Sequence, residues 1–98
     1  MELEVFYQPK VLSEDIPSLS KTVRLRIKKA IENKLLTYPQ TFGEPLRGSL
    51  VPLWKLRVGD YRVVFDVEEN KVYIHAIGHR KHIYTRIANS RDRKGKDT

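Results

Sequence analysis

The chain contains no cysteine among its 98 residues, which excludes disulfide bonds and thiolate metal sites. It also lacks any apolar run near the ~20 residues that a membrane-spanning helix needs. The first ten residues, MELEVFYQPK, do not show the basic segment followed by an apolar segment that marks a secretory signal. We therefore expect a cytoplasmic protein without a membrane partner.

Several catalytic signatures are also missing. There is no Gly-rich phosphate loop and no Ser–His–Asp signature. Acidic residues are spread over predicted turns and a strand, and so do not form the carboxylate cluster of a two-metal nuclease. These residues are Asp60, Asp66, Glu68 and Glu69. His79 and His82 show an HxxH spacing, but the neighbouring Arg80 and Lys81 would repel a metal cation. We expect no metal and no cofactor.

The charge balance is strongly basic. The formal net charge is +7, and a surplus of this size favours a polyanionic partner, most often nucleic acid. Residues 79–98 hold seven basic and two acidic residues, so five of the seven net charges lie in the last fifth of the chain. The alternative interpretation is a basic protein whose charges are simply solvated.

Hydrophobic patterning predicts one α+β domain over residues 1–90. We expect an N-terminal strand and a helical pair packed on a small antiparallel sheet, in the order β-α-α-β-β-β, with a short C-terminal helix. The predicted strands are 3–7, 54–58, 61–67 and 71–77, and the predicted helices are a short one at 13–19, a longer one at 21–36 and the last at 82–90. Residues 91–98 read as a polar, flexible tail.

The predicted sheet has two unlike faces. Alternation along 54–58 places the apolar residues on one face and Lys55 and Arg57 on the other. Arg62, in the next strand, falls on the polar side, and Gly59–Asp60 suits a type II′ hairpin turn between the two strands. Because the helices need only one face of the sheet, we expect the cationic face to remain open.

Such a face has the chemistry to act on RNA. Cleavage by the neighbouring 2′-OH needs a base for its proton, positive charge around the phosphate and an acid for the departing oxygen. Arginine supplies permanent, bidentate charge toward phosphate oxygens. Tyr84, His79 and His82 are the candidates for proton transfer, and clustered cations would favour the phenolate form of a tyrosine. Tyr84 could instead simply pack the terminal helix.

The chain also resembles a known family, over residues 1 to about 88 and including the order of the preceding helical pair. The run PLRGSLVPLWKLRVGDYRVVFDVEENKVYIHAIGHRKHIY resembles the RelE/ParE superfamily of bacterial and archaeal toxin–antitoxin modules, especially its RelE branch. The markers are LRG at 46–48, WKLRVGDYRVVF at 54–65 and GHRKHIY at 78–84. The resemblance implies a ribosome-dependent endoribonuclease that cleaves mRNA in the A site, without a metal, by 2′-OH attack.

The resemblance also implies roles for individual residues. Lys55 matches a lysine that contacts RNA and assists proton transfer, and Tyr84 matches the general base. Arg62 and Arg80 match arginines that hold the scissile phosphate and stabilise its transition state. The chain departs from RelE at Leu53, where RelE has a second lysine, and in the shorter spacing between GHR and the tyrosine. His79 or His82 therefore stays open as a partner in proton transfer.

Further residues are implied in binding RNA or the ribosome. These are Arg47, Arg57, His79, Lys81 and His82. The family also implies a cognate acidic antitoxin, partly disordered when free, that covers the basic surface. Three alternatives remain: a ParE-like inhibitor of DNA gyrase, a non-catalytic module that binds RNA or DNA, and a toxin that keeps the fold but has lost activity.

Overall fold

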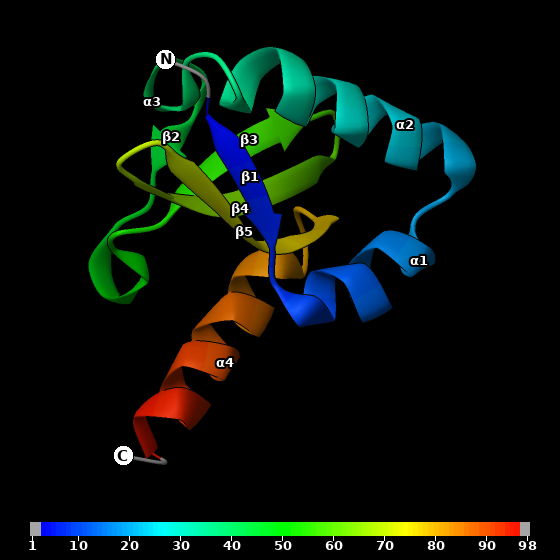
Figure 1. Cartoon of the computed structure of the whole chain (residues 1–98). Coiled ribbons are helices and arrows are strands. Elements are labelled where there is room, and N and C mark those ends of the chain that lie inside the picture. The colour runs from blue at the N-terminus through cyan, green and yellow to red at the C-terminus, as the bar shows by residue number, and fades with distance from the viewer. Residues whose placement is uncertain (1–2, 97–98) are drawn as a thin grey trace.

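The computed structural model describes the backbone of residues 3–96 and the side chains of residues 3–89. Its centre is a five-stranded sheet in the order β1-β5-β4-β3-β2 (Figure 1). The elements are β1 (Glu4–Tyr7), η1 (Val11–Asp15), α1 (Ile16–Ser18), α2 (Lys21–Ala30), η2 (Ile31–Leu35), α3 (Pro39–Phe42), β2 (Glu44–Pro45), η3 (Gly48–Leu50), β3 (Trp54–Val58), β4 (Tyr61–Glu68), β5 (Lys71–His79) and α4 (Ile83–Lys96). The α+β class and the order of the main elements are as predicted.

Strands β3, β4 and β5 form the predicted antiparallel meander. Gly59 has a φ of 61°, which suits the first central position of the type II′ turn between β3 and β4. The sheet is larger than predicted, because β1 pairs in parallel with β5 and the two-residue β2 pairs with β3. β2 lies between the predicted helix 21–36 and the predicted strand 54–58, where α3 and η3 also form.

Helix α2 begins where the sequence predicts. The Ser20 hydroxyl oxygen caps it by accepting a hydrogen bond from the Val23 amide at 3.2 Å, which satisfies one of the free amides of the first turn. The helix continues beyond Ala30 as the π-helical turn η2. Its inner face carries Ile27 and Ile31, both almost fully buried, so α2 and η2 together cover one face of the sheet.

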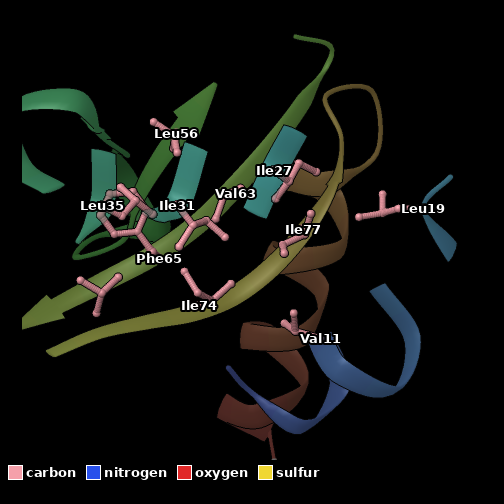
Figure 2. Close-up of a cluster of buried hydrophobic side chains, with 11 residues drawn as sticks. Val11, Leu19, Ile27, Ile31, Leu35, Leu56, Val63, Phe65, Ile74 and Ile77 are labelled. Atoms are coloured by element: carbon pink, nitrogen blue, oxygen red, sulfur yellow. The ribbon is translucent and has the colours of Figure 1, made fainter. Parts of the chain in front are cut away.

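The larger core lies between this helical layer and the sheet. Figure 2 shows Ile31 and Leu35 near Phe65, a fully buried residue of the central strand β4. The core also draws on the N-terminal helical segment through Val11 and on β5 through Ile74. Apolar surface from segments far apart in sequence is thus removed from water together, which is the main favourable contribution to folding.

Gly43 approaches this core too closely to carry a side chain. A Cβ atom there would lie 2.5 Å from Cζ of Phe65 and 2.9 Å from the carbonyl oxygen of Pro39. We expect Gly43→Ala to lower the free energy of unfolding by roughly 2–3 kcal/mol through overpacking. Gly48→Ala is the control, because Gly48 has a φ of +62° but nothing within 4 Å of the added Cβ; it should cost roughly 1 kcal/mol. Urea unfolding that ranks the two variants equally would contradict this.

The second face of the sheet is not as open as predicted. Helix α4 packs Ile83 and Ile87 over it, against Leu53, Val64 and Ala76. These five residues form a second buried cluster. The prediction was wrong over the part of β4 and β5 that α4 covers, because both faces of these strands carry apolar side chains.

Helix α4 is longer than predicted. It runs from Ile83 to Lys96, and its C-terminal half extends away from the sheet (Figure 1). The helix expected over 82–90 therefore continues through the first six residues of the predicted polar tail. The flexibility of that tail stays a prediction, and residues 97–98 lie outside the described residues. No helix within residues 3–96 is long and apolar enough to span a membrane.

An ion pair between a buried carboxylate and a partly exposed arginine connects α4 to the N-terminal helical segment. The Asp15 carboxylate is 3% exposed and accepts two hydrogen bonds of 2.6 Å from the Arg86 guanidinium, which lies 71 residues away in sequence. The same carboxylate accepts a hydrogen bond of 3.0 Å from the Ile77 amide of β5. Three separate segments therefore meet at one side chain.

Candidate functional site

The part of the second sheet face that α4 leaves open carries a row of cations, here called the basic face: Lys55, Arg57 and Arg62. Lys55 and Arg57 alternate along β3 with buried or half-buried apolar residues. Arg62 of β4 lies directly opposite Arg57 in the antiparallel register. Side chains in such pairs are close neighbours, and like charges there repel unless an anion lies between or beside them.

The protein supplies one such anion itself. β2 places Glu44 opposite Lys55, where its carboxylate lies 3.8 Å from Lys55 Nζ and 3.4 Å from Arg57 Nε. The Glu44 side chain is about half exposed, at 53%, so this carboxylate can be displaced. Glu44 was not among the predicted site residues, because a two-residue strand has no periodicity and its register cannot be derived from spacing.

Glu44 should therefore compete with a bound phosphate. We expect Glu44→Gln to tighten the binding of a single-stranded RNA oligonucleotide by about 2- to 5-fold at low salt, since exposed ion pairs contribute up to ~1 kcal/mol. Glu32→Gln changes the net charge equally but lies on helix η2, so it is the matched control. Equal affinity gains in the two variants, measured by fluorescence anisotropy, would show an effect of net charge rather than of the basic face.

Tyr84 lies beside the basic face, in the first turn of α4. Lys55 Nζ is 5.7 Å from the centroid of its ring, a distance at which a cation and an aromatic face attract each other. The Tyr84 hydroxyl is buried and has no hydrogen-bond partner. A role in proton transfer would require the ring or α4 to move, so that this hydroxyl becomes accessible.

Tyr7 provides a contrast to Tyr84. It packs against the larger core, in strand β1. Burial raises the pKa of its phenol, and the nearby negative charge of Glu32 raises that pKa further. Both effects disfavour the phenolate, so Tyr7 remains a neutral hydroxyl and is unsuited to act as a base.

Arg62 is on the predicted face but is not freely exposed. Its residue exposure is 9%, and its Nη1 donates hydrogen bonds of 2.9 Å to the carbonyl oxygens of Gly59 and Tyr61. The guanidinium is therefore committed in part to the β3–β4 turn. These two bonds restrict the orientation of the guanidinium. An arginine carries five N–H donors, and only one nitrogen, Nη1, is used in the two bonds.

Arg80 follows β5 and lies at the same turn. Its amide donates a hydrogen bond of 2.8 Å to the carbonyl oxygen of Asp60. Its side chain is 56% exposed and holds only a loose ion pair, with Nε 3.8 Å from the Asp60 carboxylate. Arg62 and Arg80 are thus both attached to the Gly59–Asp60 turn, one through Gly59 and the other through Asp60.

The two candidate histidines lie at this end of the sheet. The His79 ring packs edge-on against Tyr61, with centroids 5.6 Å apart, and its centroid is 6.3 Å from that of His82. The Lys81 amide donates a hydrogen bond of 3.2 Å to His79 Nδ1. That nitrogen acts as an acceptor, so the neutral ring would carry its proton on Nε2.

Arg47 lies on the opposite side of Lys55 from this turn, beside a hollow of about 450 Å³. The lining residues are Glu44, Pro45, Leu46, Arg47 and Lys55. The predicted residues thus fall into two groups. In the first group, Arg47 and Lys55 line the hollow, while Tyr84 lies beside Lys55, and Arg57 shares the Glu44 carboxylate with Lys55. The second group lies at or just after the end of β5 and consists of His79, Arg80, Lys81 and His82. Arg62 lies between the groups, through its contact with the β3–β4 turn.

Arg26 of α2 is a further cation at this turn. A Cβ atom on Gly59 would lie 3.1 Å from Arg26 Nη2, so α2 contributes positive charge to the same region. Among the described residues, no group of three His, Cys, Asp or Glu side chains could hold a metal ion. The positive charges of Arg26, Arg62 and Arg80 at the Gly59–Asp60 turn suit an anionic ligand.

Comparison with known proteins agrees with the resemblance in the sequence. The model of the family described as "ParE toxin of type II toxin-antitoxin system, parDE" matches residues 7–84. No curated protein sequence matches the chain significantly.

Solved structures of the same fold are also similar to the chain. The RelBE2 toxin–antitoxin complex of Mycobacterium tuberculosis contains a chain of 21% identity and TM-score 0.75, with 81% of this chain and 99% of that one covered. A free arginine-to-alanine double mutant of the Escherichia coli toxin RelE has 25% identity and TM-score 0.67, with 87% and 93% covered. The RelE–RelB complex of Pyrococcus horikoshii OT3 has 25% identity and TM-score 0.64, with 82% and 97% covered. The chain belongs to the ParE toxin family and is a toxin of a type II toxin–antitoxin module within the RelE/ParE superfamily.

Proposed function

We propose that this toxin is a ribosome-dependent endoribonuclease that cleaves mRNA in the A site. The observation that carries the proposal is the position of Tyr84, whose ring centroid lies 5.7 Å from Lys55 Nζ beside a face that also holds Arg57 and Arg62. A titratable phenol next to several fixed cations is the combination that metal-independent RNA cleavage needs. The likeness to RelE structures supports the same assignment.

The reaction itself uses groups that the RNA and the protein contain. The 2′-OH loses its proton to a base, its oxygen attacks the adjacent phosphorus, and the bond from phosphorus to the 5′-oxygen breaks. The 5′-oxygen takes a proton, and the upstream product ends in a 2′,3′-cyclic phosphate. Tyr84 serves as the base, with His79 or His82 as the alternative partner in proton transfer.

The cations stabilise the charge that develops on the phosphate. Lys55, which lies beside the Tyr84 ring, contacts the RNA. Arg62 and Arg80 hold the non-bridging oxygens, where fixed charge is worth more in the transition state than in the substrate. Arg47 and Arg57 hold flanking phosphates around the hollow beside β2, and Lys81 and the histidines extend this contact to the ribosome.

The partner that controls the toxin is proposed to be a cognate acidic antitoxin. Structures similar to this chain are toxin–antitoxin complexes, among them RelB–RelE from Methanococcus jannaschii and YoeB–YefM from Staphylococcus aureus. An acidic segment that replaces Glu44 on the basic face would neutralise the cations that RNA needs. The proposed site of action is the cytoplasm, where the ribosome and mRNA are found.

The function is tested by adding the purified toxin to ribosomes that translate a defined mRNA. Primer extension should show cuts at codons in the A site, and the same mRNA without ribosomes should remain largely intact. Cutting that is equal with and without ribosomes would contradict ribosome dependence, and no cutting in either condition would contradict the enzymatic proposal.

A second candidate is inhibition of DNA gyrase. It is favoured by the name of the matching family model, which is ParE, and by the buried hydroxyl of Tyr84. A gyrase inhibitor predicts blocked supercoiling or cleaved plasmid when toxin, gyrase and relaxed plasmid are mixed, with translation unaffected. A non-catalytic binding module predicts salt-sensitive binding to nucleic acid without any product.

A further inference from the structure

We propose that Asp15 and Arg86 are positioning residues that fix the rotation of α4 about its axis and thereby the location of the Tyr84 phenol beside Lys55. This inference rests on the proposed function of Tyr84. Neither residue belongs to the basic face, and the Asp15 carboxylate contacts α4 from the N-terminal segment of the chain.

The helical geometry of α4 makes its rotation important. Ile83 and Ile87 form the stripe that packs on the sheet. At roughly 100° per residue, Tyr84 falls on one side of this stripe and Arg86 on the other. A roll of α4 on its two isoleucines therefore lowers one of these side chains toward the sheet and raises the other.

The contact on the Tyr84 side is weak. Its hydroxyl has no hydrogen-bond partner, and the approach of Lys55 to its ring, at 5.7 Å, restrains the ring in distance but hardly in direction. Tyr84 also packs against the second buried cluster, but apolar packing has little directionality, so no hydrogen bond within the described residues fixes where its hydroxyl lies.

The contact on the Arg86 side is strong and directional. Nη1 and Nη2 of Arg86 each donate a hydrogen bond of 2.6 Å to a different oxygen of Asp15. A bidentate pair of this kind fixes the plane of the guanidinium as well as its distance. The side of α4 opposite Tyr84 therefore determines the rotation of the helix.

Asp15 can act as a fixed reference point because it is itself held by the sheet. Strand β1 ends at Tyr7, and the Ile77 amide of β5 lies beyond the last β1 pair, between Tyr7 and Ile74. The Asp15 carboxylate takes the place of a further strand residue by accepting the Ile77 amide hydrogen at 3.0 Å. With an exposure of 3%, the carboxylate has little freedom to move.

Small rotations are sufficient to matter for catalysis. The Tyr84 hydroxyl lies at the end of a long side chain, so a roll of about 10° would move it by roughly 1.5 Å around the helix axis. A misplacement of about 1 Å in a catalytic group can cost ~10²-fold in rate. The Asp15–Arg86 pair thus places the proposed base without contacting the substrate.

The first arm of the test measures cleavage by Asp15→Asn and Arg86→Lys. Asp15→Asn keeps an acceptor for the Ile77 amide but removes the charge, and Arg86→Lys keeps the charge but removes the bidentate geometry. We expect kcat for ribosome-dependent cleavage to fall by about 10-fold or more in each variant, with KM within about twofold. Ile74→Val is the control, because this fully buried residue belongs to the core on the other face of the sheet; its kcat should stay at the wild-type value.

The second arm does not depend on activity. Tyrosine labelled with ¹³C at Cζ gives one NMR signal for each phenol, and Tyr84→Phe identifies the signal of Tyr84. That signal should shift in Asp15→Asn and in Arg86→Lys, and should keep its position in Ile74→Val. If wild-type toxin cleaves no mRNA, the proposed function fails, and this arm still tests the position of the phenol. A Tyr84 signal that is the same in wild type and in both variants would overturn the inference.

Discussion

Arg80→Ala is expected to reduce the rate of ribosome-dependent mRNA cleavage by about 10²-fold or more, because one fixed charge of the transition state is lost. Folding should be little affected. The Arg80 side chain is 56% exposed and its ion pair with Asp60 is loose, at 3.8 Å, whereas the backbone bond from the Arg80 amide to Asp60 remains in the variant. Primer extension on ribosome-bound mRNA, with thermal unfolding measured alongside, gives both values.

Asp60→Asn is the matched control for Arg80→Ala. It removes the charged partner of Arg80 but leaves the guanidinium in place and keeps the Asp60 backbone carbonyl that the Arg80 amide uses. Cleavage should be unchanged or slightly faster, because the cation is then free for phosphate. A loss in Asp60→Asn as large as that in Arg80→Ala would show that the ion pair holds the turn in place and that Arg80 has no direct role.

Tyr84→Phe is expected to lower activity without lowering stability. Cleavage should fall by about 10²–10⁴-fold, the usual contribution of a general base. The free energy of unfolding should stay the same or rise, because the variant removes a buried hydroxyl that has no hydrogen-bond partner, and such a group costs ~1–3 kcal/mol when unpaired. Most mutations do the reverse and lower stability.

Tyr38→Phe is the control for this experiment. Tyr38 is 66% exposed and lies before α3, outside the basic face. Its hydroxyl can be satisfied by water, so neither activity nor stability should change measurably. If Tyr84→Phe cleaves mRNA as fast as wild type, the hydroxyl is not the base, and the role passes to His79 or His82.

The strands were predictable from sequence because their signals are local. Trp54–Val58 was predicted with its observed bounds, and Tyr61–Glu68 exceeds its predicted end by one residue. Alternation and the Gly59–Asp60 turn define this hairpin without reference to the rest of the chain. The presence of Lys55, Arg57 and Arg62 on one face follows from the same alternation.

The openness of that face was not predictable in the same way. Val64 and Ala76 lie on the side of the sheet opposite the α2 layer, and a strand that is apolar on both sides indicates cover on both sides. The three consecutive apolar residues Val63, Val64 and Phe65 of β4 indicated this cover on both sides. The alternation of apolar and polar residues could not show which element covers the second face. The position of α4 depends on contacts between segments that are distant in sequence.

The contacts of Glu44, Asp15 and Arg86 were not predicted from the sequence, for a related reason. Glu44 lies in a strand of two residues, and Asp15 and Arg86 are 71 residues apart. Each interacts with a partner that only the folded chain brings near. The burial of Arg62 likewise depends on carbonyl groups at the Gly59 turn, which residue types alone do not reveal.

The most direct test of the account is the chemical structure of the RNA ends. A translated mRNA is incubated with wild-type toxin, Arg80→Ala or Tyr84→Phe, and the fragments that end at the A site are analysed by mass spectrometry. We expect 2′,3′-cyclic phosphate ends with wild type, and their formation at a rate lower by at least about 10²-fold with each variant. Uncut mRNA with wild type, or equal amounts of cyclic phosphate with all three proteins, would contradict it.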